Sequence, residues 1–460
     1  MGRKKRACIP VVVDVIFLRA GERIYFCIER GGEMRKLLAL IGLTALFAMA
    51  DSRPPDIPFR IEMVDPGASE TAAVADINRD GRLDIVSGEY WYEAPNWKPH
   101  KFRDLSYSAG YIDNFADLPI DVNGDGYPDI VSVSWFAKKI SWWQNPGKKG
   151  GLWVEHPIDS GYPIEFAFLV DLTNSDKKQD IIPEWGSANA PLTWYEPKDG
   201  GFIRHVVSDH SYGHGIGVGD VNGDGRNDII TPKGWFEAPP DPRSGEWKFH
   251  PDWDATAGVG FCGLGAGAGQ GRGRNPNEPN AVEQTSASPT RGDLAFMYAL
   301  DINGDGRNDI LTSCAHDYGI FWLEQGENGQ WTKHDIDYSF SQAHSSALAD
   351  LRGDGRMDFV VAKRYMAHNG GDPGAREPLG VYWYEYRKTA QGGVEWIRHL
   401  IDYDGRMGGG VEMQVVDIDG DGDLDVVTGG KSGLFIARNL TRNPATRRSA
   451  ALGPKPESPK

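Results

Sequence analysis

Cysteine is scarce in this sequence, which has 4 cysteines among 460 residues. Cys8 and Cys27 lie before an apolar segment near the start of the chain, so only Cys262 and Cys314 remain in its main body. Two cysteines allow one disulfide bond in an oxidising compartment, but they exclude a small fold held by a disulfide framework. Because 40% of the residues are hydrophobic, the chain is able to bury a large core, which excludes a disordered protein.

Long apolar runs are also missing, with one exception. The segment MRKLLALIGLTALFAMADS at residues 34–52 has basic residues before its apolar run and a small-x-small site, AMA, after it. This pattern predicts a secretory signal peptide over residues 34–50, because the run is short for a membrane span. Met34 is then the start, and residues 1–33 are an upstream leader. If the leader is part of the protein, the run is an uncleaved membrane anchor instead. We expect a secreted, periplasmic or cell-surface protein.

Several motifs of other protein classes are absent. The sequence has no GxSxG nucleophile elbow, and its glycine-rich stretch at residues 258–273 lacks the GK[ST] ending of a phosphate-binding loop. Helical periodicity is missing, and short β-rich runs alternate with Gly, Pro, Asn and Asp, which is typical of an all-β protein. The formal net charge of −16 disfavours nucleic acid and anionic membranes as partners. We therefore expect no nucleic-acid partner, and a membrane partner only if the apolar run is retained.

The sequence does contain a repeat of three motifs in a constant order. The first motif is acidic and has seven copies: DINRDGRLDIV at 76, DVNGDGYPDIV at 121, DLTNSDKKQDII at 171, DVNGDGRNDII at 220, DINGDGRNDIL at 301, DLRGDGRMDFV at 350 and DIDGDGDLDVV at 417. An aromatic segment such as EYWYEAP follows each copy, weakened in the last, and then comes an aromatic residue three positions before a histidine, replaced by Glu62 in one copy. Together they define a unit of about 50 residues with four short strands.

This unit predicts the fold. One small sheet cannot bury both of its faces alone, so the units have to pack radially. We predict an all-β fold, a single seven-bladed β-propeller over residues 56–440, with a glycine-rich insertion at 253–292 and a disordered tail at 441–460. The DxNxDG loops, the aromatic blades and the signal peptide resemble the FG-GAP/VCBS repeat family, which includes the integrin α N-terminal heads and many secreted bacterial proteins. The resemblance covers about 85% of the chain. It implies the fold but not the function, because propellers host unrelated activities.

The acidic motif predicts structural calcium sites. Calcium prefers six to eight oxygen ligands, and side chains at positions 1, 3, 5 and 9 of a loop are able to surround one ion. Glycine at position 6 permits the turn, and the missing glutamate at position 12 argues against an EF-hand sensor. We expect about five sites, with these ligands: Asp76, Asn78, Asp80, Asp84, Asp121, Asn123, Asp125, Asp129, Asp220, Asn222, Asp224, Asp228, Asp301, Asn303, Asp305, Asp309, Asp417, Asp419, Asp421 and Asp425. The copy at 171 has an inserted residue and the copy at 350 has Arg352 at position 3, so these two stay open.

The repeat also isolates residues that it does not explain. Six of the 11 histidines belong to the aromatic-x-x-His pattern, and we predict that they pack and form hydrogen bonds on outer strands. In the resembled family the acidic loops lie on the bottom face, so residues before the inner strands and after the second strands lie on the top face. We predict a polar pocket there, at the top of the channel, lined by Glu165, His214, Lys233, His316, His344, Lys363, His368 and Glu412.

This pocket predicts binding of a polar ligand, of which carbohydrate is the favoured class. The segments KRYMAHNGGDPG and AHDYG also resemble the propeller domain of aldos-2-ulose dehydratases, which remove water from oxidised sugars in a metal-assisted cleft, although the cupin domains of that family are absent here. That resemblance implies a carbon–oxygen lyase. Such a lyase needs a base, an acid and a cation for the enolate. The candidates are His214 or His344 as the base, Lys233 or Lys363 beside the enolate, and Glu165 or Glu412 as an acid or metal ligand.

Other functions stay open. Imidazoles and a carboxylate from different blades are able to hold an additional divalent metal in the channel. A non-catalytic adhesion or protein-interaction module would use aromatic residues and loops on the same face, and a polar channel lining also exists in purely structural propellers. We expect a monomer. Convergence of two or more of these histidines with a carboxylate within about 5 Å would favour catalysis over simple binding.

Overall fold

The computed structural model describes the strands at residues 9–13 and 24–28 and residues 54–175, 179–257, 261–263 and 292–442. These belong to two compact units, Met1–Pro55 and Asp56–Lys460. The predicted signal peptide at 34–50, most of the glycine-rich insertion and most of the tail lie outside the described residues. In the first unit, β1 (Ile9–Val13) pairs antiparallel with β2 (Ile24–Ile28).

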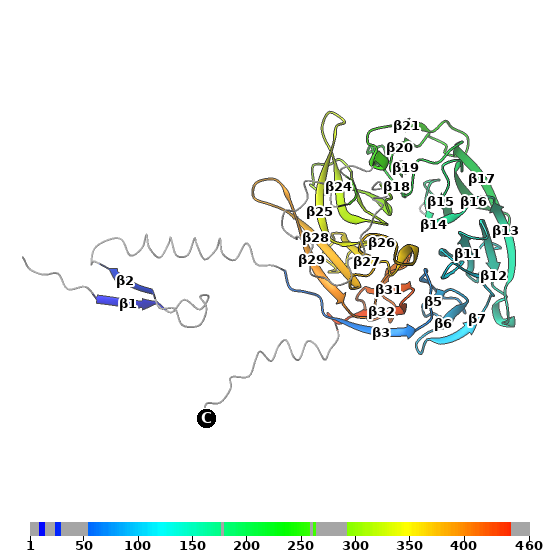
Figure 1. Cartoon of the computed structure of the whole chain (residues 1–460), viewed down its shortest axis with the longest axis horizontal. Helices are drawn as coiled ribbons and strands as arrows, with labels where there is room; N and C mark the ends of the chain where they lie inside the picture. Colours follow the sequence, from blue (N-terminus) through cyan, green and yellow to red (C-terminus); the bar gives the residue numbers. More distant parts are fainter. Residues whose placement is uncertain are drawn as a thin grey trace, which may run out of the picture. The chain divides into compact units, whose positions relative to one another are not determined.

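The second unit is an all-β β-propeller, and Figure 1 shows its sheets arranged around a common centre. In three sheets, four consecutive strands pair in chain order from the inside outward. These are β4 (Ala73–Ala75), β5 (Asp84–Ser87), β6 (Tyr90–Glu93) and β7 (Lys98–Lys101); β10 (Ala116–Ile120), β11 (Asp129–Ser134), β12 (Lys139–Gln144) and β13 (Val154–Ser160); and β14 (Ile164–Val170), β15 (Asp180–Trp185), β16 (Leu192–Lys198) and β17 (Gly201–Ser208). A short hairpin of β8 (Tyr107–Ser108) and β9 (Tyr111–Ile112) lies between the first two sheets in the sequence.

Two further groups of four strands form one eight-stranded sheet, because their inner strands β18 and β22 pair in parallel. The groups are β18 (Ile216–Gly219), β19 (Asp228–Thr231), β20 (Gly234–Glu237) and β21 (Lys248–His250), and β22 (Phe296–Leu300), β23 (Asp309–Ser313), β24 (Tyr318–Gln325) and β25 (Trp331–Ser341). The next sheet contains β26 (Ala343–Ala349), β27 (Asp358–Lys363), β28 (Gly380–Lys388) and β29 (Val394–Tyr403). The described residues contain no α-helix, only the 3-10 turns η1 (Gly147–Lys149), η2 (Ala255–Ala257) and η3 (Ala367–Gly370).

The last sheet joins the two ends of the propeller. It contains β30 (Met413–Val416), β31 (Asp425–Gly430) and β32 (Gly433–Asn439), and its outer strand is β3 (Phe59–Asp65) from the start of the unit. β3 pairs with β32 antiparallel along its whole length. This pairing closes the ring with main-chain hydrogen bonds, because the first strand of the unit completes the last sheet.

The core consists of apolar layers between neighbouring sheets. Side chains alternate between the two faces of a strand, so consecutive residues pack into different layers. On β15, Ile181 packs in the layer that contains Val131 of β11, whereas Ile182 packs in the layer that contains Ile229 of β19. All four are completely buried or nearly so. Both faces of the sheet are therefore covered, as the radial packing of the repeats predicts.

The aromatic motifs of the repeat form a stack in six places. The second motif of the repeat, the aromatic segment, supplies a tryptophan, and the third motif supplies a histidine from the outer strand. Their ring centroids lie 3.9 to 4.5 Å apart. The six pairs are Trp91 and His100, Trp142 and His156, Trp194 and His205, Trp235 and His250, Trp322 and His334, and Trp383 and His399. A carboxylate or amide on the tryptophan's strand faces the imidazole, as Glu93 faces His100 at 2.7 Å. In the last sheet Glu62 instead pairs with Arg438 at 2.9 Å. The predicted packing of these six histidines on outer strands is confirmed.

Candidate metal and ligand site

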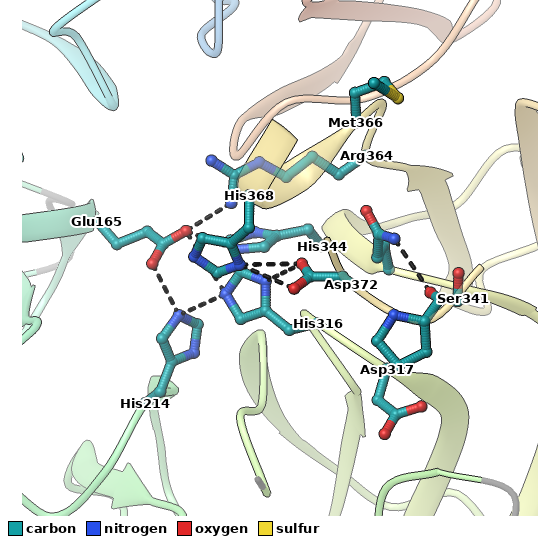
Figure 2. A network of polar contacts seen from close by, with 12 residues as sticks. Glu165, His214, His316, Asp317, Ser341, His344, Arg364, Met366, His368 and Asp372 are labelled. Carbon is teal, nitrogen blue, oxygen red and sulfur yellow. Dashed lines mark hydrogen bonds and ion pairs between the residues drawn. The ribbon is translucent and has the colours of Figure 1, made fainter. Parts of the chain in front are cut away.

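Four side chains with metal-binding atoms meet where the inner strands begin. Glu165 lies on β14, His214 directly precedes β18, His316 follows β23, and His344 lies on β26. Their potential ligand atoms all lie within 4.8 Å of one another. Figure 2 shows them pointing toward one another from different parts of the chain. We call these four residues the Glu–His cluster.

The repeat explains why these residues converge. β14 and β26 end at the acidic loops that begin with Asp171 and Asp350, so Glu165 and His344 lie at the opposite ends of the same strands. Each inner strand runs in the same direction relative to its own acidic loop. Because the sheets are arranged around one centre, the starts of their inner strands face one another across that centre.

A glycine positions His214. Gly215 has a φ of +125°, and a Cβ there would lie 2.8 Å from the Cβ of Leu294. Only glycine tolerates both the backbone conformation and this close approach. The approach allows the Nδ1–H of His214 to donate to the carbonyl oxygen of Leu294 at 2.8 Å. The other ring nitrogen, Nε2, therefore faces the cluster.

Glu165 is the common neighbour of the three imidazoles. Its Oε2 lies 3.0 Å from Nε2 of His214, and its Oε1 lies 3.7 Å from Nε2 of His316 and 3.3 Å from Nε2 of His344. Nε2 of His214 and Nε2 of His316 are 3.3 Å apart. His344 is 3% exposed, and neither of its ring nitrogens has a well-directed hydrogen bond within the described residues. A buried imidazole without partners is costly unless a ligand completes its surroundings.

A second carboxylate, that of Asp372, orients His316 through the ring nitrogen that faces away from Glu165. Asp372 lies 3.2 Å from Nδ1 of His316 and 2.9 Å from Nδ1 of His368, which is the outermost imidazole of the group. The backbone N–H of His368 donates to the hydroxyl of Tyr111 at 2.7 Å. A carboxylate on the far nitrogen of an imidazole is the usual support of a metal-binding histidine.

Buried charges set the protonation of the cluster. Arg364 forms ion pairs with Glu165 and, at 3.0 Å, with Glu70. Burial alone would raise the pKa of Glu165, but Arg364 and His214 hold it well below its usual range. Burial alone would lower the pKa of His214, yet the Glu165 carboxylate raises it to about 10, and the pKa of His316 is raised in the same way. Burial and Arg364 lower the pKa of His344 to about 3.

This donor set fits a divalent transition metal better than calcium. Three imidazole nitrogens and one carboxylate oxygen match the ligands that Zn²⁺ and related ions prefer, whereas calcium prefers oxygen alone. His344 is neutral, and its contact with Glu165 at 3.3 Å is poorly directed, so its ring nitrogens are available to coordinate a metal ion. In the metal-free protein, protons on His214 and His316 balance the charge of Glu165, and a bound cation would replace them.

The affinity for such an ion should therefore depend on pH. Because the pKa values of His214 and His316 are raised, a metal ion has to displace their protons at neutral pH, and each displaced proton contributes about a factor of ten per pH unit. We expect Zn²⁺ to bind at least about tenfold tighter at pH 7 than at pH 6. Titration against a competing chromophoric chelator at both values measures this, and equal affinities would show that neither imidazole is a ligand.

Three predicted pocket residues are not part of this group. Lys233 is exposed in the turn between β19 and β20. Lys363 is fully buried, and its Nζ donates to Ser341 Oγ at 2.7 Å and to the carbonyl oxygen of Gly374 at 2.9 Å. Burial lowers the pKa of Lys363 to about 8. Glu412 lies in a separate network, where it accepts a hydrogen bond from the backbone N–H of Asp117 at 3.0 Å.

Arg364 and Asp372 were not among the predicted lining residues. Arg364 directly follows Lys363, and neighbouring residues on a strand point to opposite sides, so a one-residue difference in position decides which of them faces the cluster. The register between β26 and β27 also shifts between Ala343 and Ser345, which sequence spacing does not reveal. Asp372 had a signal in the sequence, because it lies four residues after His368 in the long connection KRYMAHNGGDPG.

In the acidic loops, backbone N–H groups of the same loop hold the carboxylates in place. In the loop at Asp301, the first carboxylate accepts the N–H groups of Asp305 and Gly306 at 3.0 and 2.9 Å. Asp309 is fully buried and accepts the N–H groups of Ile302 and Gln325. The other four complete loops repeat this pattern. Burial raises the pKa of Asp309 to about 6, although the hydrogen bonds from the backbone N–H groups of Gln325 and Ile302 partly offset this effect.

One complete loop brings three carboxylates together. The ligand atoms of Asp417, Asp419 and Asp425 lie within 4.8 Å of one another. In the loop at 350, the guanidinium of Arg352 occupies the corresponding space, 3.2 Å from Asp354 and 2.9 Å from Asp358, with Glu385 as a further partner. Calcium binding by the five complete loops stays a prediction, and the loop at 350 carries a side-chain cation instead.

The two cysteines of the main body form a disulfide bond. Cys262 from the glycine-rich insertion is bonded to Cys314, and the Cα atoms are 5.8 Å apart. Cys314 lies two residues before His316, and its N–H donates to the carbonyl oxygen of Gly319 at 2.8 Å. The bond thus anchors the insertion beside the chain segment that carries one histidine of the Glu–His cluster.

Comparison with known proteins identifies the repeat. Residues 301–361 match the model of the FG-GAP-like repeat family. No curated protein matches the chain, so the resemblance to aldos-2-ulose dehydratases stays a prediction. Among the described residues, no helix is both long and apolar enough to cross a membrane.

Solved structures with a similar fold are distant in sequence. A lectin from Agrocybe aegerita that recognises non-reducing terminal N-acetylglucosamine is 18% identical, with a TM-score of 0.43 over 85% of this chain and 94% of the lectin. BBS1N in complex with ARL6DN is 11% identical, with a TM-score of 0.47 over 85% of this chain and 99% of that chain. The β-propeller domain of Cps50 (Swd1) from Myceliophteria thermophila is 11% identical, with a TM-score of 0.43 over 83% of this chain and 100% of that domain. By its strand pairing the second unit is a β-propeller, and its residues 301–361 carry an FG-GAP-like repeat.

Proposed function

We propose that this propeller binds a divalent transition metal at the Glu–His cluster and, beside that metal, a polar ligand of the carbohydrate class. The observation that carries the proposal is the convergence of Glu165 with three imidazoles, one of which, His344, is buried and has no well-directed hydrogen bond within the described residues. Architectural polar groups in a propeller are normally satisfied by their neighbours. Each of the six stacked histidines of the outer strands has at least one hydrogen-bonded ring nitrogen, whereas neither ring nitrogen of His344 has a well-directed hydrogen bond in the described residues.

We further propose that the site is catalytic and removes water from an oxidised sugar. In this reaction a carbon next to a carbonyl loses its proton, the neighbouring carbon–oxygen bond breaks, a carbon–carbon double bond forms, and the oxygen leaves as water. A bound divalent ion would supply Lewis-acid polarisation of the carbonyl oxygen. Glu165, His214, His316 and His344 would hold the ion, while Arg364 and Asp372 orient Glu165 and His316. The base predicted at His214 or His344 is then another group, since both imidazoles serve as ligands.

We also propose a number of blades, which the assignment of strands to sheets does not give directly. We propose that the two halves of the eight-stranded sheet are separate blades, which gives seven blades in total and one acidic loop for each. We propose structural calcium at the five complete loops, because their carboxylates are preorganised by backbone N–H groups. The proposed secretion of the protein is supported by the bond between Cys262 and Cys314, since disulfides persist in oxidising compartments.

The test uses the metal-free protein and one defined sugar. We expect Zn²⁺ or Mn²⁺ to bind one site outside the calcium loops, and the loaded protein to convert D-glucosone, a 2-keto sugar, into a product lighter by one water, detected by mass spectrometry. Absence of a bound transition metal would overturn the proposal. Sugar binding without conversion would overturn the catalytic part and favour the non-catalytic binding module.

A further inference from the structure

A small cavity adjoins the His214 side of the Glu–His cluster. It has a volume of about 20 Å³, enough for one water molecule or one hydroxyl oxygen but not for a sugar ring. Most of its lining is apolar or aromatic, including Trp185, Leu192 and Tyr212. The one carboxyl group in its lining is that of Glu184.

Glu184 is an unsatisfied acid within the described part of the chain. It lies on β15, it is 4% exposed, and its Oε2 has no hydrogen-bond partner there. A buried carboxyl group without partners costs free energy unless a ligand or water satisfies it. No repeat motif accounts for this residue: Glu184 is the fifth residue of β15, and the fifth residues of the corresponding strands β11 and β27 are Val133 and Ala362.

The cavity lies beside the chain segments that carry two residues of the proposed metal site, Glu165 and His214. Glu184 pairs with Phe166 across β14 and β15, directly beside the register shift that contains Glu165. Two of the lining residues, Gly213 and Gly215, flank His214 in the sequence. The cavity and the cluster therefore share the segment around His214 and the strand pair β14–β15.

We propose that this cavity is a subsite for one hydroxyl group of the ligand and that Glu184 forms the hydrogen bond that recognises it. The inference rests on the proposed function. It adds that the protein recognises one hydroxyl group of the ligand next to the metal. A hydroxyl group matches the size of the cavity, and its apolar neighbours fit the C–H groups of a polyol or sugar. Burial raises the pKa of Glu184 to about 7, so near neutral pH the group is able to accept or donate the bond.

The test compares Glu184→Gln with the unchanged protein, both loaded with Zn²⁺. We expect the substitution to weaken binding of D-glucosone by about tenfold or more, because a hydrogen bond to a charged group is replaced by a neutral one. The Zn²⁺ affinity should stay within about twofold. A second variant, Ser211→Leu, fills the cavity from its rim and should weaken sugar binding without touching the carboxyl group.

Monodeoxy analogues of D-glucosone identify the hydroxyl group. One analogue should bind equally to the unchanged protein and to the Glu184→Gln variant, since it lacks the group that the carboxyl recognises. Equal sugar affinity of the Glu184→Gln variant and the unchanged protein would overturn the subsite while leaving the proposed function intact. A large loss of Zn²⁺ affinity would also overturn it, because Glu184 would then act on the metal. If the unchanged protein binds neither Zn²⁺ nor the sugar, the proposed function itself fails.

Discussion

Replacing His344 with alanine should lower the affinity for Zn²⁺ by at least about 100-fold and abolish turnover of the keto sugar. His344 is the one imidazole of the cluster that is both neutral at working pH and without a hydrogen-bond partner in the described residues. Its removal leaves one carboxylate and two imidazoles that carry protons in the metal-free protein, and three protein ligands hold zinc far less tightly than four. A chelator competition assay measures the affinity.

The matched control for this prediction is His334→Ala. His334 stacks on Trp322 and contacts Glu324 at 2.7 Å on an outer strand, so its loss should affect stability slightly and leave Zn²⁺ binding unchanged. His316→Ala provides a second variant of the cluster in case His344→Ala does not fold. If both cluster variants fold and keep the affinity of the unchanged protein, the Glu–His cluster is not a metal site.

Removing calcium should lower the melting temperature by about 10 °C or more. Each ion bound only by the folded state adds about 2.7 kcal/mol when its concentration is 100 times the dissociation constant, and 1 kcal/mol corresponds to a few degrees in a large domain. Without the ion, the preorganised carboxylates of each loop repel one another. The measurement is thermal melting with EGTA and with added calcium, made in the His344→Ala variant so that loss of the transition metal does not contribute.

Two loops provide a matched pair for the calcium prediction. Asp305→Asn removes the negative charge of a proposed ligand in a complete loop and should reduce the calcium-dependent part of the stability. Asp354→Asn changes the same position of the loop at 350, where Arg352 already lies among the carboxylates, and should leave the calcium dependence unchanged. A melting temperature that does not respond to calcium in the parent variant would contradict structural calcium in all of these loops.

The repeat made much of this protein predictable. Seven acidic motifs and their aromatic partners predicted an all-β propeller, and the six repeated histidines were correctly assigned to outer-strand packing. The same periodicity separated five unrepeated histidines from the scaffold. Three of them, His214, His316 and His344, lie together with Glu165, and His368 lies beside His316. Distance along the chain from the acidic loop was sufficient to find them, because it corresponds to a constant position on each inner strand.

Other residues depended on details that spacing does not contain. Lys363 was predicted to line the pocket, but its neighbour Arg364 is the residue that forms an ion pair with Glu165. Lys363 instead donates a hydrogen bond to Ser341. Glu412 directly precedes β30 and lies in another network, where it accepts a hydrogen bond from the backbone N–H of Asp117. A shift of one residue reverses the side of a strand to which a side chain points, and register shifts are invisible in a sequence.

The sequence by itself therefore determined the repeated unit, its strand order and the set of side chains that the unit does not need, because these follow from local periodicity. Only the tertiary structure decided which of those side chains meet, since Glu165 and His344 come from different sheets and approach each other only when the ring closes. The pairing of Cys262 with Cys314, the partners of Arg352 and the unsatisfied state of His344 and Glu184 likewise depend on packing between segments far apart in the chain.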